Sequence, residues 1–237
     1  MTSVDMPGDP ALAATRAAYD ATAATYVRSI GTEISESIEA PLDRSILHEF
    51  SSLFSHAALV ADLGCGPGRA GALLATTGAE VIGIDLSLAM VQIGSRAHPE
   101  QSFAVGDLSA LALADRCLDG AVCWYSIIHT EPEHLDVLFD EIARVLVADG
   151  HLLVAFQAGN GERLQRTDVQ GTPVTLTNYR HDPDDVVRRL TRAGFEVKSC
   201  VVRGPELAHE STAQAFVVAR SAGRPALAGA QSQPGCA

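Results

Sequence analysis

Apolar residues in the N-terminal part of the chain recur with the spacing of amphipathic helices. Residues 11–28 are rich in alanine, and Tyr19 and Tyr26 lie seven positions apart on one helical face. After Pro41, apolar residues keep a helical period to about residue 55. Because both predicted helices precede the first strand, residues 11–56 are expected to form a helical cap on the domain that follows.

Short apolar segments then alternate with helical ones. Strands are predicted at 58–63, 80–85, 102–106, 120–125, 151–157, 195–202 and 213–220. Helices are predicted at 69–77, from the N-cap Ser87 to about Pro99, at 132–147 and at 183–193. Several strands are apolar on both faces, as in a sheet buried between two helix layers. The pattern predicts one doubly wound α/β domain at 57–220, with a mainly parallel sheet.

The C-terminal part of this domain departs from strict alternation. Ten residues separate the last two predicted strands, too few for a crossover helix, so these strands should pair antiparallel. Residues 158–180 are polar and contain glycine, which predicts a long loop that is functional or partly ordered. The lead-in at 1–10 and the tail at 221–237 are expected to be disordered.

Composition limits the classes of partner. The 237 residues suffice for one α/β domain, and the net charge of −12 disfavours nucleic acid because an acidic surface repels phosphates. No apolar run reaches the ~18 residues of a membrane span. No signal peptide is evident either, so a cytoplasmic protein without a membrane partner is expected. The five cysteines form no CxxC pair and no metal-ligand pattern. The oligomeric state stays open between monomer and homodimer.

The most informative segment joins the first predicted strand to its helix, in the letters VADLGCGPGR at 60–69. Its glycines, Gly64, Gly66 and Gly68, allow the backbone to pass close beneath a ligand. Dinucleotide-binding loops read G-x-G-x-x-G, but here Arg69 stands where the third glycine belongs. Asp62 precedes the loop, and its carboxylate would repel a pyrophosphate. The loop therefore predicts a cationic ligand such as an ammonium or a sulfonium.

Two further carboxylates follow the next two strands. Asp85 ends the second strand, where an acidic group can accept hydrogen bonds from ribose hydroxyls. Asp107 follows the third strand and can accept from an adenine amino group, with the Leu108 backbone beside the ring. Each also has a plain structural interpretation, a helix cap for Asp85 and an ordinary Gly-Asp turn for Asp107.

These motifs carry a family resemblance. VADLGCGPGR, VIGIDLS at 81–87 and FAVGDLSAL at 103–111 precede LDGAVCWYSIIHT at 118–130 and RVLVADGHLLVAF at 144–156. Together they resemble class I S-adenosylmethionine-dependent methyltransferases, in particular the type 11 and ubiquinone/menaquinone group, over residues 15–220. The resemblance implies a Rossmann-like seven-stranded sheet with its last strand antiparallel, S-adenosyl-L-methionine as cofactor, and a small-molecule substrate.

The resemblance also implies a cofactor site at the strand ends. Asp62 and residues 64–68 would face the methionine part, Asp85 the ribose, and Asp107 the adenine. The implied cofactor-binding residues are Asp62, Gly64, Cys65, Gly66, Gly68, Asp85, Leu86, Met90, Asp107, Leu108, Tyr125, Ser126 and Tyr26. Whether the cap tyrosines close over the methionine carboxylate or only pack the cap is left open.

Candidate catalytic and substrate residues lie at the same predicted sheet edge. His129 follows the fourth strand and has a side chain suited to removing a proton near neutral pH, although capping the next helix or lining the pocket would also explain it. Gln157 ends the fifth strand, and Tyr179 ends the predicted 158–180 loop. With Tyr19, these residues are the predicted substrate contacts.

Three functions remain compatible with these residues. The first is methylation of a small molecule, with oxygen as the favoured acceptor atom and nitrogen or carbon left open. The second uses the methyltransferase fold to bind the cofactor without methyl transfer, in a pericyclic or regulatory role. The third is a nicotinamide-dependent oxidoreductase, against which Asp62 and Arg69 both count.

Overall fold

The computed structural model describes residues 9–169 and 171–223. Most of the predicted lead-in and tail therefore lies outside the described residues. The predicted bounds of the lead-in (1–10) and the tail (221–237) need correction. Asp9 caps the N-terminus of the first helix, which begins at Pro10, and Ser221 is the last residue of the last strand.

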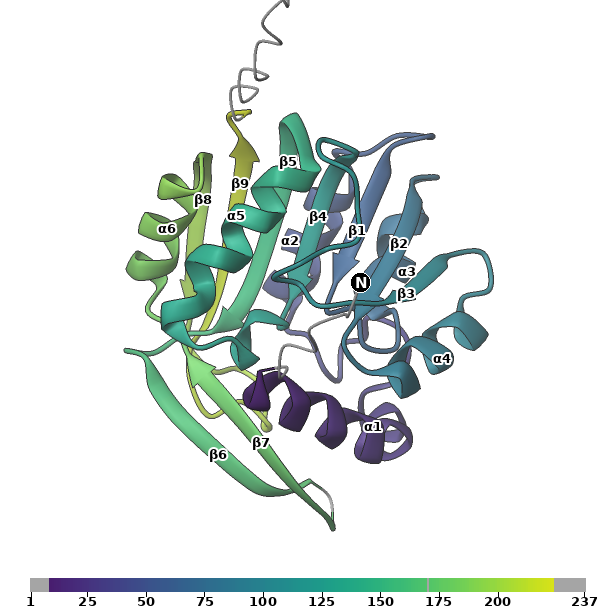
Figure 1. The fold of residues 1–237 in the computed structure, drawn as a ribbon, viewed down its shortest axis with the longest axis vertical. Coiled ribbons are helices and arrows are strands. Elements are labelled where there is room, and N and C mark those ends of the chain that lie inside the picture. The colour runs from purple at the N-terminus through teal and green to yellow at the C-terminus, as the bar shows by residue number, and fades with distance from the viewer. Residues whose placement is uncertain (1–8, 170, 224–237) are drawn as a thin grey trace, which may run out of the picture.

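The core of the fold is a seven-stranded sheet in the order β3-β2-β1-β4-β5-β9-β8 (Figure 1). Its strands are β1 (Leu59–Leu63), β2 (Glu80–Asp85), β3 (Ser102–Val105), β4 (Leu118–Trp124), β5 (Leu146–Gln157), β8 (Phe195–Arg203) and β9 (Gln214–Ser221). Strands β1 to β5 pair in parallel, whereas β9 runs antiparallel to both β5 and β8. The predicted doubly wound sheet with an antiparallel last strand is confirmed.

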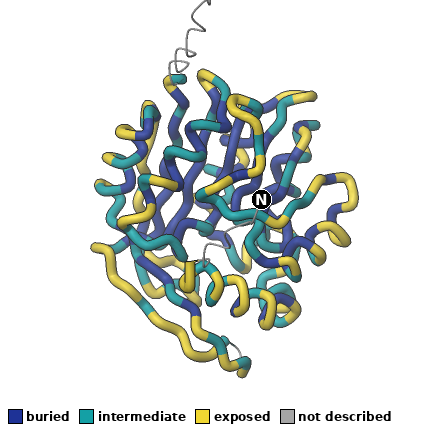
Figure 2. The backbone as a smooth tube through the Cα atoms, viewed as in Figure 1, coloured by how far each residue is buried: buried dark blue, intermediate teal, exposed yellow. Residues whose placement is uncertain are grey.

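Helices cover both faces of this sheet (Figure 1). They are α3 (Arg69–Ala75), α4 (Leu88–Ala97), α5 (Leu135–Val145) and α6 (Pro183–Arg192), with short 3-10 segments η1 (Ile127–His129) and η2 (Pro132–His134) before α5. The helix predicted at 132–147 is thus divided and ends at Val145, where β5 begins. Helix α5 buries the apolar face that its sequence predicts, with Leu138, Phe139 and Ile142 at most 2% exposed. The central strands are buried along their length (Figure 2).

The two N-terminal helices have different places, which corrects the expectation of a single cap at 11–56. Helix α1 (Pro10–Ile30) lies across the sheet edge at which the parallel strands end, against α4 and β7 (Figure 1). Helix α2 (Pro41–Ser51) instead packs against α3, and its Leu47 and Phe50 join one of the two apolar clusters of the core. Helix α2 lies there because it has an apolar face, which packs on the sheet beside α3.

The segment predicted as a long loop at 158–180 is a β-hairpin. Strands β6 (Glu162–Val169) and β7 (Thr172–Arg180) pair antiparallel and project beyond the sheet (Figures 1 and 2). Most β6 side chains are exposed, so its sequence lacks the apolar alternation by which strands are recognised. Strand β7 buries Leu176, Asn178 and Tyr179 and lies against α1 and η1. Tertiary contacts therefore order a segment whose local pattern is that of a loop.

A buried ion cluster fixes α2 to the far edge of the sheet. The Arg203 guanidinium on β8 donates to both carboxylate oxygens of Asp43, including a 2.6 Å bond from Nε to Oδ1. The same guanidinium donates from Nη1 to Glu210 at 2.8 Å. Arg203 is 7% exposed and Asp43 is 1% exposed. Each charge of this cluster thus depends on its partners, because water does not replace them.

Replacing Arg203 should therefore be costly. Arg203→Met leaves two buried carboxylates without a cation, and we expect a loss of about 3–5 kcal/mol in the free energy of unfolding. Arg220→Met is the control, because its pairs with Asp149 and Glu196 are solvent-exposed, and its loss should stay within about 1 kcal/mol. Urea unfolding of both variants measures the difference, and equal losses would contradict the structural role given to the cluster.

Candidate functional site

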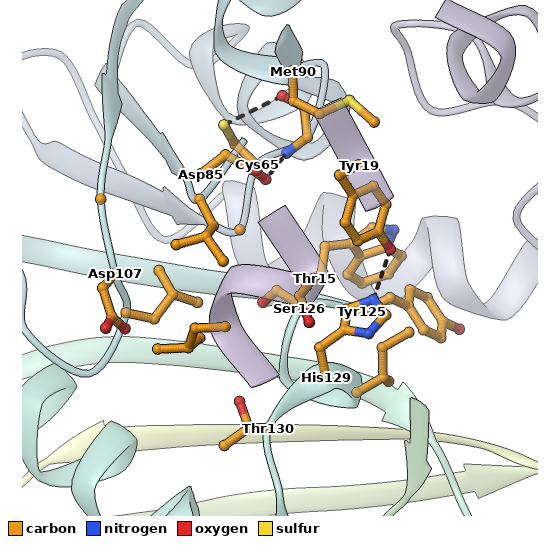
Figure 3. Close-up of a pocket in the computed structure, with 18 of the residues that line it drawn as sticks. Thr15, Tyr19, Cys65, Asp85, Met90, Asp107, Tyr125, Ser126, His129 and Thr130 are labelled. Atoms are coloured by element: carbon orange, nitrogen blue, oxygen red, sulfur yellow. Dashed lines mark hydrogen bonds between the residues drawn. The ribbon is translucent and has the colours of Figure 1, made fainter. Parts of the chain in front are cut away.

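A cavity of about 500 Å³ opens at the carboxyl ends of the parallel strands, beneath α1 (Figure 3). The three carboxylates predicted for this edge, Asp62, Asp85 and Asp107, all line it. Helix α1 contributes Tyr19 and Tyr26 to the opposite wall. The structure thus brings together three carboxylates that lie up to 45 positions apart in the chain, because parallel strands end at one edge of their sheet.

The glycine loop is shaped by backbone geometry that only glycine adopts without strain. Gly64, Gly66 and Gly68 have φ of 72°, 52° and 87°. A Cβ at Gly64 would lie 2.2 Å from Ser126 Cβ, whereas one at Gly66 would meet no atom within 4 Å. Gly66 therefore leaves open space where the loop lines the cavity. Gly68 does not line it: a Cβ there would meet the Phe103 ring, so its role is packing rather than ligand contact.

Asp62 is a buried carboxylate with one oxygen unused. Its residue is 1% exposed, and Oδ2 accepts a 2.8 Å hydrogen bond from the Gly71 backbone N–H. The other oxygen, Oδ1, has no hydrogen-bond partner within the described part of the chain. Burial, with a smaller contribution from nearby Asp85, raises the pKa of Asp62 to about 7. Such a carboxylate gains a great deal from a cationic hydrogen-bond donor.

The other two carboxylates are held in place by their own loops. Asp85 accepts 2.8 Å bonds from Gly66 N–H and from Ser87 N–H, and burial raises its pKa. Asp107 accepts from the backbone and hydroxyl of Ser109 through Oδ1. The turn interpretation of Asp107 is confirmed, but the N-cap of α4 is Ser87 rather than Asp85, which accepts from the Ser87 N–H. These local hydrogen bonds hold both carboxylates in place. They do not exclude ligand binding, because each carboxylate has about four accepting positions.

The chain leaves β4 through a strained residue. Tyr125 has φ of 60°, a region that non-glycine residues rarely occupy and that is often found at functional sites. Its N–H donates to the Ala155 carbonyl at 2.9 Å, and its ring packs edge-on against Trp124 and Phe216. This bend carries Ser126 and η1 along the cavity wall.

His129 connects three parts of the chain. Its Nδ1 lies 2.8 Å from the Thr177 carbonyl on β7, so this nitrogen must donate. Its Nε2 lies 2.7 Å from the Tyr19 hydroxyl on α1, and in the neutral ring this nitrogen accepts (Figure 3). Burial lowers the pKa of His129 to about 4, helped by nearby Arg166 and opposed by the Thr177 bond. The ring therefore stays neutral at physiological pH.

Two polar interactions that the sequence did not indicate hold the cover of the cavity in place. Asp20 on α1 accepts from the Ser87 hydroxyl at 2.5 Å and from Ala89 N–H at 3.1 Å, at the N-terminus of α4. Arg69 donates through Nε to the Glu33 carbonyl at 3.0 Å and forms a buried ion pair with Glu39 at 2.8 Å. Both contacts join positions far apart in sequence, so no local motif reveals them.

The remaining predicted residues divide into two groups. Cavity-lining residues from the prediction also include Cys65, Leu86, Met90, Leu108, Tyr125 and Ser126. Gln157 and Tyr179 do not line the cavity, which removes the geometric basis for their predicted substrate contacts. The Tyr179 hydroxyl instead donates to Glu131, a residue of the cavity wall, at 2.8 Å. The Gln157 carbonyl accepts from His181 N–H where the hairpin leaves the sheet.

Trp124 lies in the apolar core, but it also reaches the cavity wall. Its indole Nε1 has no hydrogen-bond partner among the described residues.

No group of three or more His, Cys, Asp or Glu side chains suited to a metal ion occurs at 9–169 and 171–223. None of the helices in these ranges is long and apolar enough to cross a membrane.

Residues 60–150 match the family described as "Methyltransferase domain". A demethylmenaquinone methyltransferase of Beutenbergia cavernae is 33% identical over 40% of this chain and 39% of its own length. An O-methyltransferase of Pyrenophora dematioidea is 27% identical over 70% of this chain and 65% of its own length. The chain thus spans about two fifths of the length of the demethylmenaquinone methyltransferases it matches.

Solved structures share the fold over most of the chain. Magnesium protoporphyrin IX methyltransferase from Synechocystis PCC 6803, with bound S-adenosylmethionine, superposes with a TM-score of 0.68 at 18% identity, covering 91% of this chain and 99% of that one. The [4+2]-cyclase SpnF superposes with a TM-score of 0.66 at 16% identity, covering 88% and 95%. Residues 60–150 thus resemble a methyltransferase domain, and the chain shares the fold of solved S-adenosylmethionine-dependent methyltransferases.

The glycine loop gives a direct test of the site. Gly64→Ala should destabilise the protein by about 3 kcal/mol, from a strained φ and overlap with Ser126. It should also weaken binding of S-adenosylhomocysteine at least tenfold. Gly161→Ala is the matched control, because its φ is also positive but its Cβ has open space. Calorimetric titration and thermal unfolding measure both effects, and equal behaviour of the two variants would contradict the shape argument.

Proposed function

We propose that this protein transfers a methyl group from S-adenosylmethionine to a hydroxyl oxygen of an uncharged small molecule. The observation that carries the proposal is the convergence of Asp62, Asp85 and Asp107 with the glycine loop around one cavity covered by α1. When bound, the cofactor supplies a methyl group on a sulfonium, whose sulfur is a good leaving group. The protein's part is to hold the cofactor and the acceptor molecule, to orient them toward each other, and to exclude water.

The residues of the cavity fit this cofactor chemically. The unpaired Oδ1 of Asp62 suits the ammonium of the methionine part, with backbone groups of Tyr125 and Ser126 nearby. Asp85 would accept from the ribose hydroxyls, and Asp107 from the adenine amino group. Leu86, Met90 and Leu108 supply apolar surface for the nucleoside. The open space beside Gly66 allows the ligand to approach the loop backbone closely.

The charges of the wall disfavour an anionic acceptor. Its acidic side chains are Asp9, Asp62, Asp85, Asp107 and Glu131, and its basic ones are Arg69, His129 and His134. Among the described residues of the wall, Arg69 is the one basic side chain besides the histidines, and Glu39 already neutralises it. A carboxylate acceptor would therefore meet mainly negative charge. Oxygen as the acceptor atom is further supported by the relative from Pyrenophora dematioidea, which is described as an O-methyltransferase.

His129 is the proposed final acceptor of the hydroxyl proton. Its low pKa keeps the imidazole unprotonated and able to accept across the neutral range. The same low pKa makes it a weak base, so it cannot remove the proton from a free alcohol or phenol in advance. It suits proton removal during methyl transfer, because the hydroxyl becomes strongly acidic as its oxygen gains the methyl group.

Cofactor affinity should depend on pH through Asp62. Its pKa is about 7 in the free site, and an ammonium ligand favours the ionised form, so binding releases a proton. Affinity for S-adenosylhomocysteine should rise with pH by up to about tenfold per unit below pH 7 and level off above it. Calorimetry in two buffers of different ionisation enthalpy measures the released proton. Asp62→Asn should bind more weakly and lose the proton release, and retention of that release would exclude Asp62 as its source.

Methyl transfer itself is tested by turnover of methyl-labelled S-adenosylmethionine over a panel of uncharged phenols, enols and alcohols. We expect label in at least one of them and none in matched carboxylic acids. Label confined to amines or acids would overturn the acceptor assignment.

The nicotinamide alternative is tested by titration with NAD(H), for which Asp62 and Arg69 predict no binding heat.

A second candidate function keeps the cofactor but not the methyl transfer. The observation in its favour is that the same fold occurs in the [4+2]-cyclase SpnF, so fold alone does not determine the reaction. Tight binding of S-adenosylmethionine without turnover of any acceptor in the panel would favour this pericyclic or regulatory role.

A further inference from the structure

Both ring nitrogens of His129 are already engaged in the closed site. Nδ1 donates to the Thr177 carbonyl, and Nε2 accepts from the Tyr19 hydroxyl. An acceptor molecule in the cavity therefore finds no free nitrogen on this ring. The next atom along this chain of hydrogen bonds is the Tyr19 oxygen, and Tyr19 itself lines the cavity.

We propose that Tyr19 is a catalytic residue, and that the hydroxyl to be methylated donates its hydrogen bond to the Tyr19 oxygen rather than to His129. This inference rests on the proposed function and specifies its proton path. A phenolic oxygen can donate one hydrogen bond and accept others, so Tyr19 can bond to His129 and to the acceptor at once.

The surroundings of Tyr19 fit a relay better than a base that acts alone. Burial, with Tyr26 and Asp85 nearby, raises the pKa of Tyr19 well above its ordinary value, so it keeps its proton. The ionisable groups that influence the pair are Tyr26 on α1, Asp85 at the end of β2 and Arg166 on β6. Arg166 makes an imidazolium less favourable, so it favours release of the proton from His129 after the transfer.

The atoms balance without a further reactant. The acceptor oxygen forms a bond to the methyl carbon while the bond from that carbon to sulfur breaks. The acceptor proton passes to the Tyr19 oxygen, and the Tyr19 proton passes to His129 Nε2. The positive charge of the sulfonium thus ends on the imidazolium, which loses its proton to water when the product leaves. The hydrogen bond from Nδ1 to Thr177 holds the ring in the tautomer that this step requires.

The position of Tyr19 links this chemistry to the cover of the cavity. Its ring lies edge-on to Tyr26 at 5.8 Å and to His129 at 5.2 Å between ring centroids. Its neighbour Asp20 fastens α1 to the N-terminus of α4. The proton path is therefore complete only while α1 lies over the cavity.

Tyr19→Phe tests the relay, because it keeps the ring contacts and removes only the oxygen. With the acceptor that shows the highest turnover in the labelled panel, we expect kcat to fall at least tenfold, as for loss of a general base. Affinity for S-adenosylhomocysteine should stay within about twofold, since the lost hydrogen bond joins two groups of the protein. Arg28→Ala is the control on the exposed side of the same helix and should change neither quantity.

Two further measurements separate a relay from a purely structural role. The double variant Tyr19→Phe/His129→Ala should be no slower than the slower single variant, because both residues act in one path. For the wild-type protein, kcat should be measured in mixtures of light and heavy water. A plot of kcat against the fraction of heavy water should be curved rather than linear, which indicates that two protons are in transfer. The curve for Tyr19→Phe should lose this curvature.

The outcomes are distinct. Retention of more than half of kcat in Tyr19→Phe, or additive losses in the double variant, would overturn the relay and mean that the acceptor displaces Tyr19 to reach His129. Wild-type protein that binds the cofactor but methylates nothing in the panel would overturn the proposed function and the relay together.

Discussion

The parallel direction of strands β1 to β4 is the constraint on which the rest of this structure depends. Parallel strands finish at the same edge of the sheet, so whatever follows each strand meets at that edge. The glycine loop follows β1, Asp85 ends β2, Asp107 follows β3, and Tyr125 follows β4. No contact between these segments is needed to bring them together, because the ladder of backbone hydrogen bonds does so.

The burial of Asp62 then determines what this edge can bind. Asp62 lies beneath the loop with one carboxylate oxygen unpaired, and burial holds its pKa near 7. An unpaired carboxylate in such surroundings is unfavourable until a cation reaches it. The acidic wall acts in the same direction, and the one arginine of the wall is neutralised by Glu39. The electrostatics of the cavity are therefore matched to a positively charged ligand and opposed to a pyrophosphate.

Two elements outside the sheet complete the site. Helix α1 brings Tyr19 and Tyr26 over the cavity, and the β6–β7 hairpin supports α1 and supplies the Thr177 carbonyl to His129. Neither element belongs to the repeating strand–helix pattern. The sheet and its loops form the part of the site that suits the cofactor, while α1 and the hairpin govern the histidine and the space beside it.

Much of this fold was predictable from the sequence, because strand and helix periods and glycine turns are local properties. The sequence also predicted that one sheet edge would carry Asp62, Asp85, Asp107 and His129, because each of them follows or ends a predicted parallel strand. The hairpin at 162–180 was not, since β6 is polar and is ordered only by pairing with β7. The separate places of α1 and α2, the ion pairs of Arg69 and Arg203, and the bond between Tyr19 and His129 were decided by tertiary structure alone. These contacts join residues up to 160 positions apart, and no spacing along the chain encodes such a distance.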